Sequence, residues 1–460
     1  MKPEHKIPFQ LMALVMAAWL WLPGQARGAS EGAHGQPQAL TLDLEAAVDL
    51  GLKNNPRIQA MAFALERSHS EIKSLRGRFL PRLSAGYGQT WLESLDARGP
   101  SDDDYINQIQ ENWRLSLQQP LYAGGTILNT YRKAQIQQES VLLEKESEER
   151  RLIRRIQEAY LQLLKAREDR RSLEQTVARL QVSHEAAGAF VAQQMAPYVE
   201  VLQAQVDLED AMQQLSQTKN LETIHQVSLD GLLGVEEGSV IYAGALSDID
   251  PSRDFKLDEC QQTAQASRTE LKLLETNMQL ARKEKQIATG QGLPRVTLQM
   301  SATDYNRDYD EPGANLFGKF DRDQQNQYWS AGVSVEWNFF NGGEFYYRRQ
   351  SMENEIQRLE RLQQDTRATI RTEVNSAFLR LREARDRVDA TTTSLKTAGE
   401  GYRMEKTRLE MRVGTIQALL NAQDRLTRAE ANRNMAIHDY RLALADLYYA
   451  MGTRNDALDP

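Results

Sequence analysis

The side chains that most often carry out catalysis or bind metal ions are scattered along this sequence. Its six histidines form no HExxH pair, and its single cysteine, Cys260, has no partner for a disulfide. Two acidic runs, Asp102–Asp104 and Asp308–Glu311, could bind divalent cations, but they lack the ligand spacing of a calcium loop, and solvated acids are the simpler interpretation. The sequence also contains no nucleophile elbow and no phosphate loop. We therefore predict no enzyme, no metal site and no cofactor.

The composition narrows the class of protein. The chain has 460 residues, of which 26% are charged and 7% aromatic, and its mean hydropathy is −0.60. These values are typical of a helix-rich chain and exclude a bundle of membrane-spanning helices. The formal charge of −8 argues against a nucleic-acid partner. Cys260 lies too far from the N-terminus to carry the lipid of a lipoprotein, so we expect it to be a small buried hydrophobe.

The N-terminus has the features of an export signal. A cationic start at 2–6 precedes an apolar run at 7–22 and a stretch of small residues at 26–29. We predict a signal peptide over residues 1–28, cleaved near Gly28. A retained membrane anchor is the alternative, but the apolar run is shorter than the roughly 20 residues that a spanning helix needs. The mature chain is then exported, and it is either soluble or inserted in a membrane by means other than helices.

Two Gly-Gly pairs point to an internal repeat. Gly124 and Gly342, which open these pairs, are 342 − 124 = 218 residues apart. At that offset, IQEAYLQLLKAR at 156–167 matches VNSAFLRLREAR at 374–385. Upstream, at an offset of 292 − 79 = 213, FLPRLSAGYG at 79–88 matches GLPRVTLQMS at 292–301. Chance similarity between coiled helices could imitate the helical part, but not the whole order of elements. The sequence therefore predicts one unit used twice in tandem.

The repeat predicts how the chain divides. Each copy begins with a helical hairpin, continues through two strands and ends in a long helical hairpin. The first hairpin breaks at Asn54-Asn55-Pro56, where proline follows two turn-forming residues. The predicted segments are a signal peptide at 1–28, a first repeat at 40–232, a linker at 233–257, a second repeat at 258–452 and a tail at 453–460.

Alternating segments predict strands that cross a membrane. Apolar and small polar residues alternate over about 82–92, 112–122, 294–304 and 328–340, with Trp or Phe near the ends of the apolar face. About ten residues are enough for a tilted strand to cross a bilayer. A strand pair in a soluble sandwich shows the same alternation. Four strands cannot close a barrel around a lumen, and lipid does not tolerate an open edge, so we expect other subunits to complete the barrel.

Two polar loops join the predicted strands. They span 96–112 and 304–327 and contain the two acidic runs. If the strands cross a membrane, we expect these loops to face the cell exterior.

The end of each strand pair is predicted to be a flexible junction. Pro120 lies at the rim of the second strand, and the glycines that follow give the permissive backbone that a turn from strand into helix requires. The predicted junction residues are Pro120, Gly124, Gly125, Gly342 and Gly343.

A very long helix is predicted after each glycine pair. From about Ile127 to Val191, apolar residues recur in steps of three and four, as in coiled coils. At about 1.5 Å per residue, such a helix is on the order of 100 Å long. The chain turns near 195–197 and 413–415, and a second helix returns. A hairpin this rich in polar residues needs lateral partners of its own kind.

Several short motifs occur in a fixed order along the chain. They are NNPRIQA at 54–60, LPRLS and LPRVT at the strand openings, QPLYAGG and WNFFNGG at the junctions, and VGTIQALLNAQDRL at 413–426. In this order, over about 40–452, the chain resembles the outer membrane efflux protein family typified by TolC. The resemblance implies an α+β membrane protein. It would be a homotrimer whose twelve-stranded β-barrel, with four strands from each chain, continues as a long α-helical barrel through the periplasm.

The resemblance also implies a function. Members of that family serve as the outer-membrane exit channel of tripartite efflux pumps and type I secretion systems. They join an inner-membrane pump of the RND, ABC or MFS type through a periplasmic adaptor protein, contact outer-membrane lipid and hydrolyse nothing themselves. Two alternatives remain open, a periplasmic coiled-coil protein without a pore and a passive porin. The porin is disfavoured because only about 50 residues are predicted as strand. The sequence does not reveal the cargo.

The helical tip is the first site that the resemblance implies. In the family, the adaptor docks at a VGT segment, which Arg412, Val413, Gly414 and Thr415 match here. The tip of the first repeat lacks the glycine, so the two tips need not dock alike. The corresponding residues of the first tip are Met195, Ala196 and Pro197.

The periplasmic aperture is the second implied site. In TolC-like members, acidic residues of the second return helix ring the closed aperture, at the positions of Ala418 and Asn421 here. Neither residue is acidic. The nearest candidate in the first repeat is Glu200, one turn before Gln203. A carboxylate ring would attract cations, but Glu200 can also be a solvated residue on the face of a helix.

Overall fold

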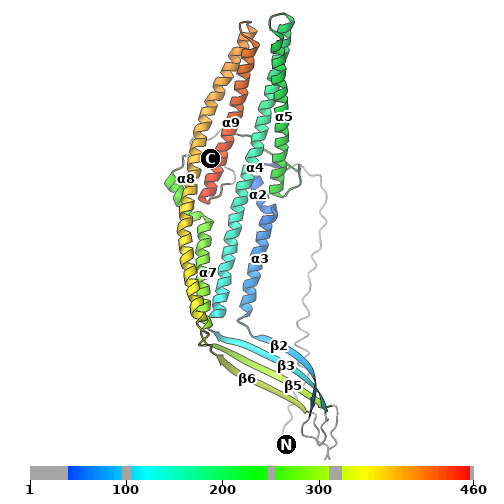
Figure 1. Cartoon of the computed structure of the whole chain (residues 1–460), viewed down its shortest axis with the longest axis vertical. Coiled ribbons are helices and arrows are strands. Elements are labelled where there is room, and N and C mark those ends of the chain that lie inside the picture. Colours follow the sequence, from blue (N-terminus) through cyan, green and yellow to red (C-terminus); the bar gives the residue numbers. More distant parts are fainter. Residues whose placement is uncertain (1–39, 96–104, 247–253, 310–323, 456–460) are drawn as a thin grey trace, which may run out of the picture. The chain divides into compact units, whose positions relative to one another are not determined.

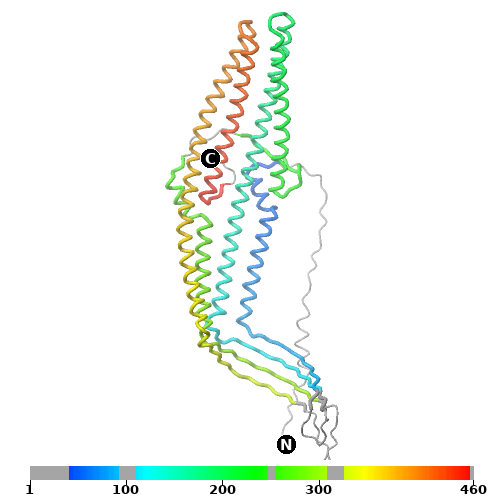
Figure 2. Tube along the Cα trace, in the orientation of Figure 1, coloured from blue at the N-terminus to red at the C-terminus, as the bar shows by residue number. Residues whose placement is uncertain are grey.

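The computed structural model describes residues 40–95, 105–246, 254–309 and 324–455 (Figures 1 and 2). Its contacts divide the chain into residues 1–40 and 41–460, and the elements below belong to the second unit, except that one short strand begins at Leu40. The predicted signal peptide, Asp102–Asp104 and two of the four residues of Asp308–Glu311 lie outside the described residues. No helix in the described part is both long enough and apolar enough to cross a membrane.

Two short helical hairpins precede the strand pairs. In the first, Asp43 caps α2 by accepting from the N–H of Ala46 at 2.8 Å, and Asn55 caps α3 by accepting from the N–H of Arg57 at 2.9 Å. Pro56 stands at the first turn of α3, where its missing N–H costs nothing, so the predicted break is confirmed. The hairpins comprise α2 (Leu44–Asn54) and α3 (Pro56–Gly77), then α6 (Leu257–Ser267) and α7 (Thr269–Gln291).

Four antiparallel strands form one sheet, in the order β2-β3-β5-β6. All four reach beyond the predicted spans toward the loops, because ladder pairing continues as far as Leu95 opposite Tyr105 and Gln108 opposite Tyr309. Much of each predicted loop, 105–112 in the first and 304–309 with 324–327 in the second, is therefore strand. The strands are β2 (Arg82–Leu95), β3 (Tyr105–Ala123), β5 (Arg295–Tyr309) and β6 (Gln324–Glu336).

The last strand ends earlier than the alternation of the sequence suggests. We predicted a strand to about residue 340, but β6 ends at Glu336, opposite Arg295. The residue before Arg295 is Pro294, which has no N–H to extend the ladder. Trp337 leaves the sheet instead, and its indole N–H donates to the carbonyl of Gly292 at 3.1 Å.

Two long helical hairpins follow the strand pairs and have equal lengths. The first helix of each has 67 residues and the second has 36. At about 1.5 Å per residue, the longer helices extend on the order of 100 Å. Figure 1 shows α3, α4, α7 and α8 side by side where they leave the strands. The hairpins are α4 (Thr126–Ala192) with α5 (Tyr198–Leu233), and α8 (Glu344–Glu410) with α9 (Ile416–Met451).

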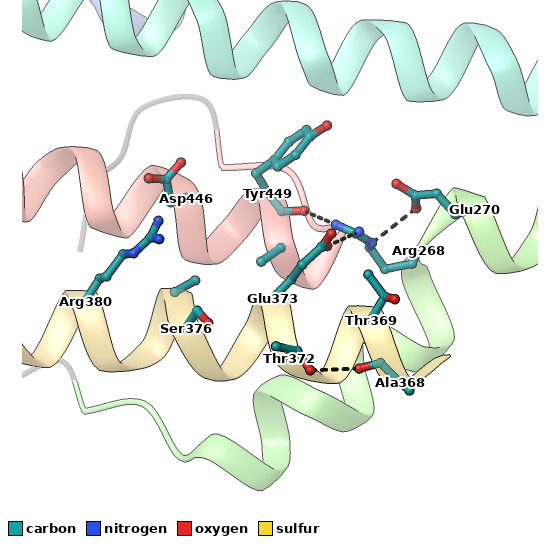
Figure 3. A pocket seen from close by; sticks show the side chains of 12 residues that line it. Arg268, Glu270, Ala368, Thr369, Thr372, Glu373, Ser376, Arg380, Asp446 and Tyr449 are labelled. Atoms are coloured by element: carbon teal, nitrogen blue, oxygen red, sulfur yellow. Dashed lines mark hydrogen bonds and ion pairs between the residues drawn. The ribbon is translucent and has the colours of Figure 1, made fainter. Parts of the chain in front are cut away.

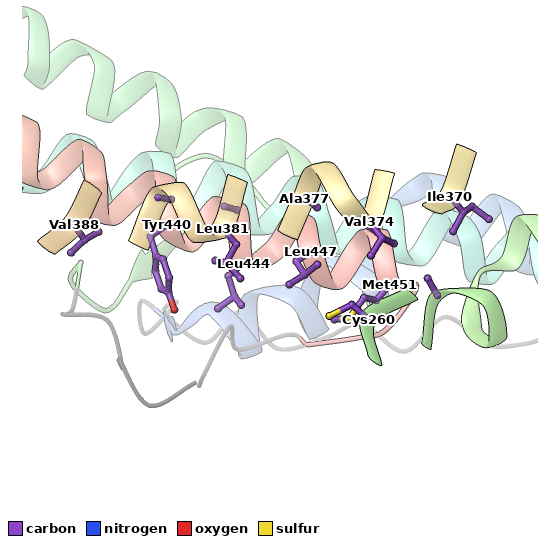
Figure 4. Close-up of a cluster of buried hydrophobic side chains, with 14 of the residues drawn as sticks. Cys260, Ile370, Val374, Ala377, Leu381, Val388, Tyr440, Leu444, Leu447 and Met451 are labelled. Atoms are coloured by element: carbon purple, nitrogen blue, oxygen red, sulfur yellow. The ribbon is translucent and has the colours of Figure 1, made fainter. Parts of the chain in front are cut away.

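The largest cores lie where the short helices meet the long ones. One packs α2 against α4 and α5 and includes Leu152, Ile156 and Leu229. The other packs α6 against α8 and α9 (Figure 4), where Cys260 lies beside Met451. Cys260 is buried and unpaired, which confirms the prediction of a small buried hydrophobe.

Two buried tyrosines, Tyr160 and Tyr242, belong to the first core. β1 (Leu40–Leu42) pairs with β4 (Val240–Tyr242). The hydroxyl of Tyr160 on α4 donates to the carbonyls of Leu42, at 3.2 Å, and Ala243. Burial, with a smaller contribution from Asp43, raises the pKa of Tyr160 from 10.0 to about 12.

We expect this tyrosine to make the protein sensitive to alkali. The pKa of Tyr160 is higher in the folded protein than in the unfolded chain. The contribution of Tyr160 to the free energy of unfolding is therefore complete below about pH 10 and is lost as the pH rises toward about 12. The loss is at most about 1.4 kcal/mol per pH unit in that window. Denaturant titrations at several pH values measure it. Tyr160→Phe, which cannot ionise, should lose less stability over the same window, and equal losses in the two proteins would contradict this assignment.

Candidate functional site

The sheet has one strongly apolar and exposed face. Alternate residues of its four strands place large hydrophobic side chains on that face. Soluble monomers rarely expose so large a continuous patch, and such patches mark protein or membrane contacts. The exposed side chains include Leu83, Tyr87, Trp91, Trp113, Leu115, Met300, Trp329, Val333 and Val335.

The opposite face is small and polar. Ser84, Ser116, Ser301 and Ser330 stand opposite one another in register and form a row across all four strands. Hydroxyl oxygens lie 2.7 Å apart between Ser84 and Ser116, and 2.9 Å apart between Ser301 and Ser330. An apolar face backed by hydroxyl groups suits a sheet with lipid on one side and water on the other.

Both edges of this sheet are open. Within the described residues, β2 pairs only with β3, and β6 pairs only with β5. The outer edge of each terminal strand therefore presents backbone N–H and C=O groups that a further strand can pair with.

The predicted junctions have a left-handed backbone. The φ angles are 61° at Gly124, 74° at Gly125, 66° at Gly342 and 88° at Gly343, which side chains other than glycine rarely adopt. Pro120 lies three residues inside the end of β3, at a register shift that breaks the ladder between Pro120 and Tyr122.

The first junction is also sterically tight. A Cβ added to Gly124 would lie 2.1 Å from the carbonyl oxygen of Gly290, and one added to Gly290 would lie 2.2 Å from the carbonyl oxygen of Gly124. The end of α7 therefore touches the start of α4 backbone to backbone. Sequence reasoning named Gly124 but missed Gly290.

The two helical tips have the same type of turn. Gln194 and Arg412 both have positive φ, of 57° and 63°. Each follows the last turn of a long helix, and each turn closes with the pair of hydrogen bonds of a Schellman motif. At the first tip, the N–H groups of Gln194 and Met195 donate to the carbonyls of Val191 and Phe190, respectively, at 2.9 Å. At the second tip, the N–H groups of Arg412 and Val413 donate to the carbonyls of Leu409 and Arg408, respectively, also at 2.9 Å.

Gly414 does not shape the second tip through its φ. A Cβ there would lie 3.0 Å from the backbone nitrogen of Leu409, which is a tight contact, whereas Ala196 occupies the matching position of the first tip. The two hydrogen bonds of the turn are nevertheless present at both tips. Both tips expose apolar side chains, Met195 on one and Val413 on the other.

We expect glycine to relieve strain at the tips. A residue other than glycine in the left-handed region costs about 1 kcal/mol or more. Arg412→Gly and Gln194→Gly should therefore stabilise the protein, or leave it unchanged after the added chain entropy of glycine. Thermal unfolding followed by circular dichroism measures this. Lys406→Gly, in the exposed interior of α8, is the control and should cost about 1 kcal/mol; a similar loss at the tip positions would refute the strain.

The four predicted aperture residues lie in the first turns of the return helices. Glu200 and Ala418 are half-buried, whereas Gln203 and Asn421 are exposed. Ala418 donates its N–H to the Thr415 hydroxyl at 3.2 Å, and Asn421 accepts from the Gln417 amide at 3.2 Å. These contacts belong to helix capping and to the helix surface.

A group of carboxylates that sequence reasoning missed lies farther along the same helices. Burial, then Asp210 and Asp424, raise the pKa of Asp207 above its usual value. Asp424 also accepts from Arg428 at 3.0 Å. Asp207 and Asp210 lie in α5, whereas Asp424 lies in α9. The sequence therefore showed only the spacing of the first two.

A groove of about 670 Å³ runs along α8 beside α9 (Figure 3). Arg268 lies at one end of it and donates to Glu373 and to the Tyr449 carbonyl, and it pairs with Glu270 at 3.1 Å. The guanidinium is thus held by groups of the chain itself. In the part of the chain that the structure describes, no cluster of three or more His, Cys, Asp or Glu side chains could hold a metal ion.

The decisive comparison is with protein families. The model of the outer membrane efflux protein family matches residues 47–235 and 261–453. The chain belongs to the outer membrane efflux protein family. This confirms the resemblance seen in the sequence, and the family is one of channel proteins.

Solved structures show the same fold. A membrane protein from Pseudomonas aeruginosa has a TM-score of 0.74 at 18% identity, over 95% of this chain and 98% of that one. The CusC channel protein has a TM-score of 0.73 at 14% identity, over 94% and 99%. The open state of the Neisseria gonorrhoeae MtrE outer membrane channel has a TM-score of 0.72 at 15% identity, over 92% and 94%. A comparison with curated protein sequences finds no match.

Proposed function

We propose that this chain is the outer-membrane exit channel of a tripartite efflux pump or type I secretion system. Three copies form the channel. Their four-stranded sheets make a twelve-stranded barrel in the outer membrane, and their long hairpins make a helical barrel in the periplasm. A signal peptide exports each chain.

The two-faced sheet carries this proposal. Its apolar face fits lipid, its serine row fits a water-filled lumen, and its open edges fit pairing with neighbouring copies. A periplasmic coiled-coil protein without a pore would have no use for an exposed apolar sheet. A passive porin would not need hairpins of 67 and 36 residues.

The helical tips support the proposal of an adaptor protein as partner. Exposed apolar side chains at both turns, Met195 and Val413 among them, fit docking of a periplasmic adaptor that links the channel to an inner-membrane pump. Because both turns have the same backbone, we expect the adaptor to contact both. In this proposal, adaptor contact shifts the closed aperture, near Glu200 and Ala418, toward an open form.

Deletion and complementation test the function. Loss of the chain should raise the intracellular level of a substrate of the cognate pump, and the wild-type chain should restore export. The restored protein should fractionate with the outer membrane and migrate as a trimer that dissociates on heating. A soluble monomer that restores nothing would reject the channel.

Val413→Glu tests the tip. Docking of the adaptor would bury the charge of the new glutamate, so this variant should lose most export. Its trimer yield and outer-membrane location should stay normal. Lys406→Glu, on the exposed surface of α8, is the matched control and should export normally. Normal export by Val413→Glu would remove the tip from the docking surface.

A further inference from the structure

The arginines of the sheet lie on one of its two faces. The polar face is the one that carries the serine row, and Arg114 stands two residues before Ser116 of that row on β3. Side chains on alternate residues of a strand share a face, so Arg114 lies on the polar face. The same count from Ser84 and Ser301 places the other strand arginines there. Over 82–92, 109–123, 295–307 and 326–336, the basic residues are Arg82, Arg114, Arg295 and Arg307, and the apolar face carries none.

The acidic residues of the same strands lie mainly on the apolar face. There, Glu111 accepts from the Tyr87 hydroxyl at 3.1 Å, and Asp304 accepts from the Gln327 amide at 3.2 Å. Over the same four ranges, the polar face carries a single acid, which is Glu336. The polar face therefore has an excess of positive charge.

Arg114 lies at the middle of β3 and is exposed. Its neighbour in β2 is Gly86, where an added Cβ would meet no atom within 4 Å, so the Arg114 side chain does not fold across that strand. Arg307, by contrast, donates to the Tyr305 hydroxyl at 2.8 Å. Within the described residues, Arg114 forms no ion pair. Its charge is therefore open to solutes in the space over the polar face.

A second pair of arginines follows the internal repeat. Arg82 and Arg295 are 295 − 82 = 213 residues apart and occupy the same position of LPRLS and LPRVT. Each is exposed and is the first residue of its strand, at the end of the sheet that adjoins the helices (Figure 1). Glu336 stands opposite Arg295, but in the described part of the chain the two form no ion pair. Both halves of the chain thus place a positive charge at the same end of the polar face.

We propose that the lumen of the barrel is an anion-selective passage and that Arg114 is its selectivity-determining residue. In the trimer of the proposed function, on which this inference rests, the polar faces of three copies surround the lumen, and the three Arg114 side chains form one ring. Rings of arginine in a pore favour anions. The solutes that pass most readily carry carboxylate, sulfonate or phosphate groups, and cations are repelled at the wall.

The range of the electrostatic field decides where it must be measured. At physiological ionic strength, the field of an exposed charge decays over about 8 Å. The ring therefore acts on solutes near the wall, where a low-dielectric surface strengthens the field. Ser84 is a suitable position for a probe, because it is exposed and is the diagonal neighbour of Arg114 across β2 and β3. Such neighbours are roughly 7–8 Å apart.

A thiol in place of Ser84 reports the local potential. In a Cys260→Ala background, trimers of Ser84→Cys are reacted with an anionic reagent, 2-sulfonatoethyl methanethiosulfonate, and with a cationic one, 2-(trimethylammonium)ethyl methanethiosulfonate. Each rate constant is divided by that of the same reagent with free 2-mercaptoethanol. The measured quantity is the ratio of the anionic value to the cationic value, and we expect it to exceed one.

Changes at Arg114 should lower this ratio according to the charge removed. Arg114→Gln should lower it about twofold and Arg114→Glu about fourfold, whereas Arg114→Lys keeps the charge and should keep the ratio. In 1 M salt, where the Debye length is about 3 Å, the values should converge. A wild-type ratio below one, or a ratio that neither Arg114→Gln nor Arg114→Glu changes, would overturn the anion preference.

Leu115→Cys is the matched control, and it separates this inference from the proposed function. Leu115 is the next residue along β3 and lies on the apolar face, so its thiol should be covered by lipid or detergent and react slowly with both charged reagents. If the Ser84→Cys thiol reacts with both reagents and the charge at Arg114 has no effect, the water-filled channel stands and the anion preference falls. If that thiol reacts with neither reagent while the Leu115→Cys thiol reacts with both, the polar face does not line the water and both proposals fall.

Discussion

Gly124→Ala is expected to prevent folding of the junction and to abolish recovery of stable protein. The methyl group would lie 2.1 Å from the Gly290 carbonyl oxygen, on a backbone whose φ is 61°. Backbone on the opposing side cannot swing away as a flexible side chain can. The overlap adds to the left-handed penalty, and we expect a loss of about 3 kcal/mol or more. Thermal unfolding of protein purified from membranes measures it.

Two neighbouring glycines give graded controls. Gly125 has a φ of 74°, but a Cβ there meets only the Asn129 amide nitrogen at 3.6 Å, so Gly125→Ala should show only the left-handed penalty of about 1–2 kcal/mol. Gly342→Ala should show the same penalty in the single chain. Equal effects of Gly124→Ala and Gly125→Ala would mean that the contact with Gly290 is not tight in solution.

The junctions show what a sequence can and cannot predict. Gly-Gly before a long helical pattern is a local signal, and it located Gly125 and Gly343 one residue before α4 and α8. The contact of Gly124 with Gly290 joins residues that are far apart in the chain. It depends on how α7 packs against α4, which no local pattern contains.

The strands illustrate a second limit. Alternation predicted all four strands, because side chains on successive residues of a strand point to opposite faces. The strand ends were less predictable. Trp337 and Phe339 continue the alternation beyond Glu336, yet the ladder stops because Pro294 ends the neighbouring strand. Toward the loops, the hydrogen-bonded pairing of the strands continues beyond the alternation of apolar residues. Polar residues such as Asn306 and Gln325 are therefore in strands.

At the helical tips, the sequence located the turns but did not identify the residue of unusual conformation. Glycine is the usual left-handed residue after a helix. The structure instead places Arg412 and Gln194 in that conformation. The hydrogen bonds of each turn fix the position of the left-handed residue from the end of the helix, whatever its side chain.

Asp230→Ala is expected to have the second largest effect, on the core that joins α5 to β4. Asp230 is fully buried near the end of α5. One of its carboxyl oxygens accepts from the Tyr242 hydroxyl, and the other accepts from the N–H of Gly238 at 3.0 Å. Alanine would leave both donors in the core without this acceptor. Each unsatisfied buried group costs about 1–3 kcal/mol, so we expect a loss of about 3 kcal/mol.

A double-mutant cycle isolates the tyrosine contact. Burial, and then the hydrogen bond to Asp230, raise the pKa of Tyr242 far above its usual value, so the hydroxyl keeps its proton and remains a donor. Tyr242→Phe removes that donor but leaves Gly238 bonded to Asp230, so it should cost less than Asp230→Ala. The two changes together should cost less than the sum of the single changes, by about 1–2 kcal/mol.

Denaturant unfolding of the four proteins gives the coupling energy. Additive losses would show that Tyr242 and Asp230 do not stabilise each other, and the short strand β4 would then be held by its pairing with β1 and by its contacts with α4. A positive coupling instead fixes the segment after α5 to the end of that helix. Gly234 lies in the same segment, and a Cβ there would be 3.1 Å from the carbonyl oxygen of Asn54. The segment therefore ties the end of α5 to α2, and loosening it should also weaken the packing of α2 in the first core.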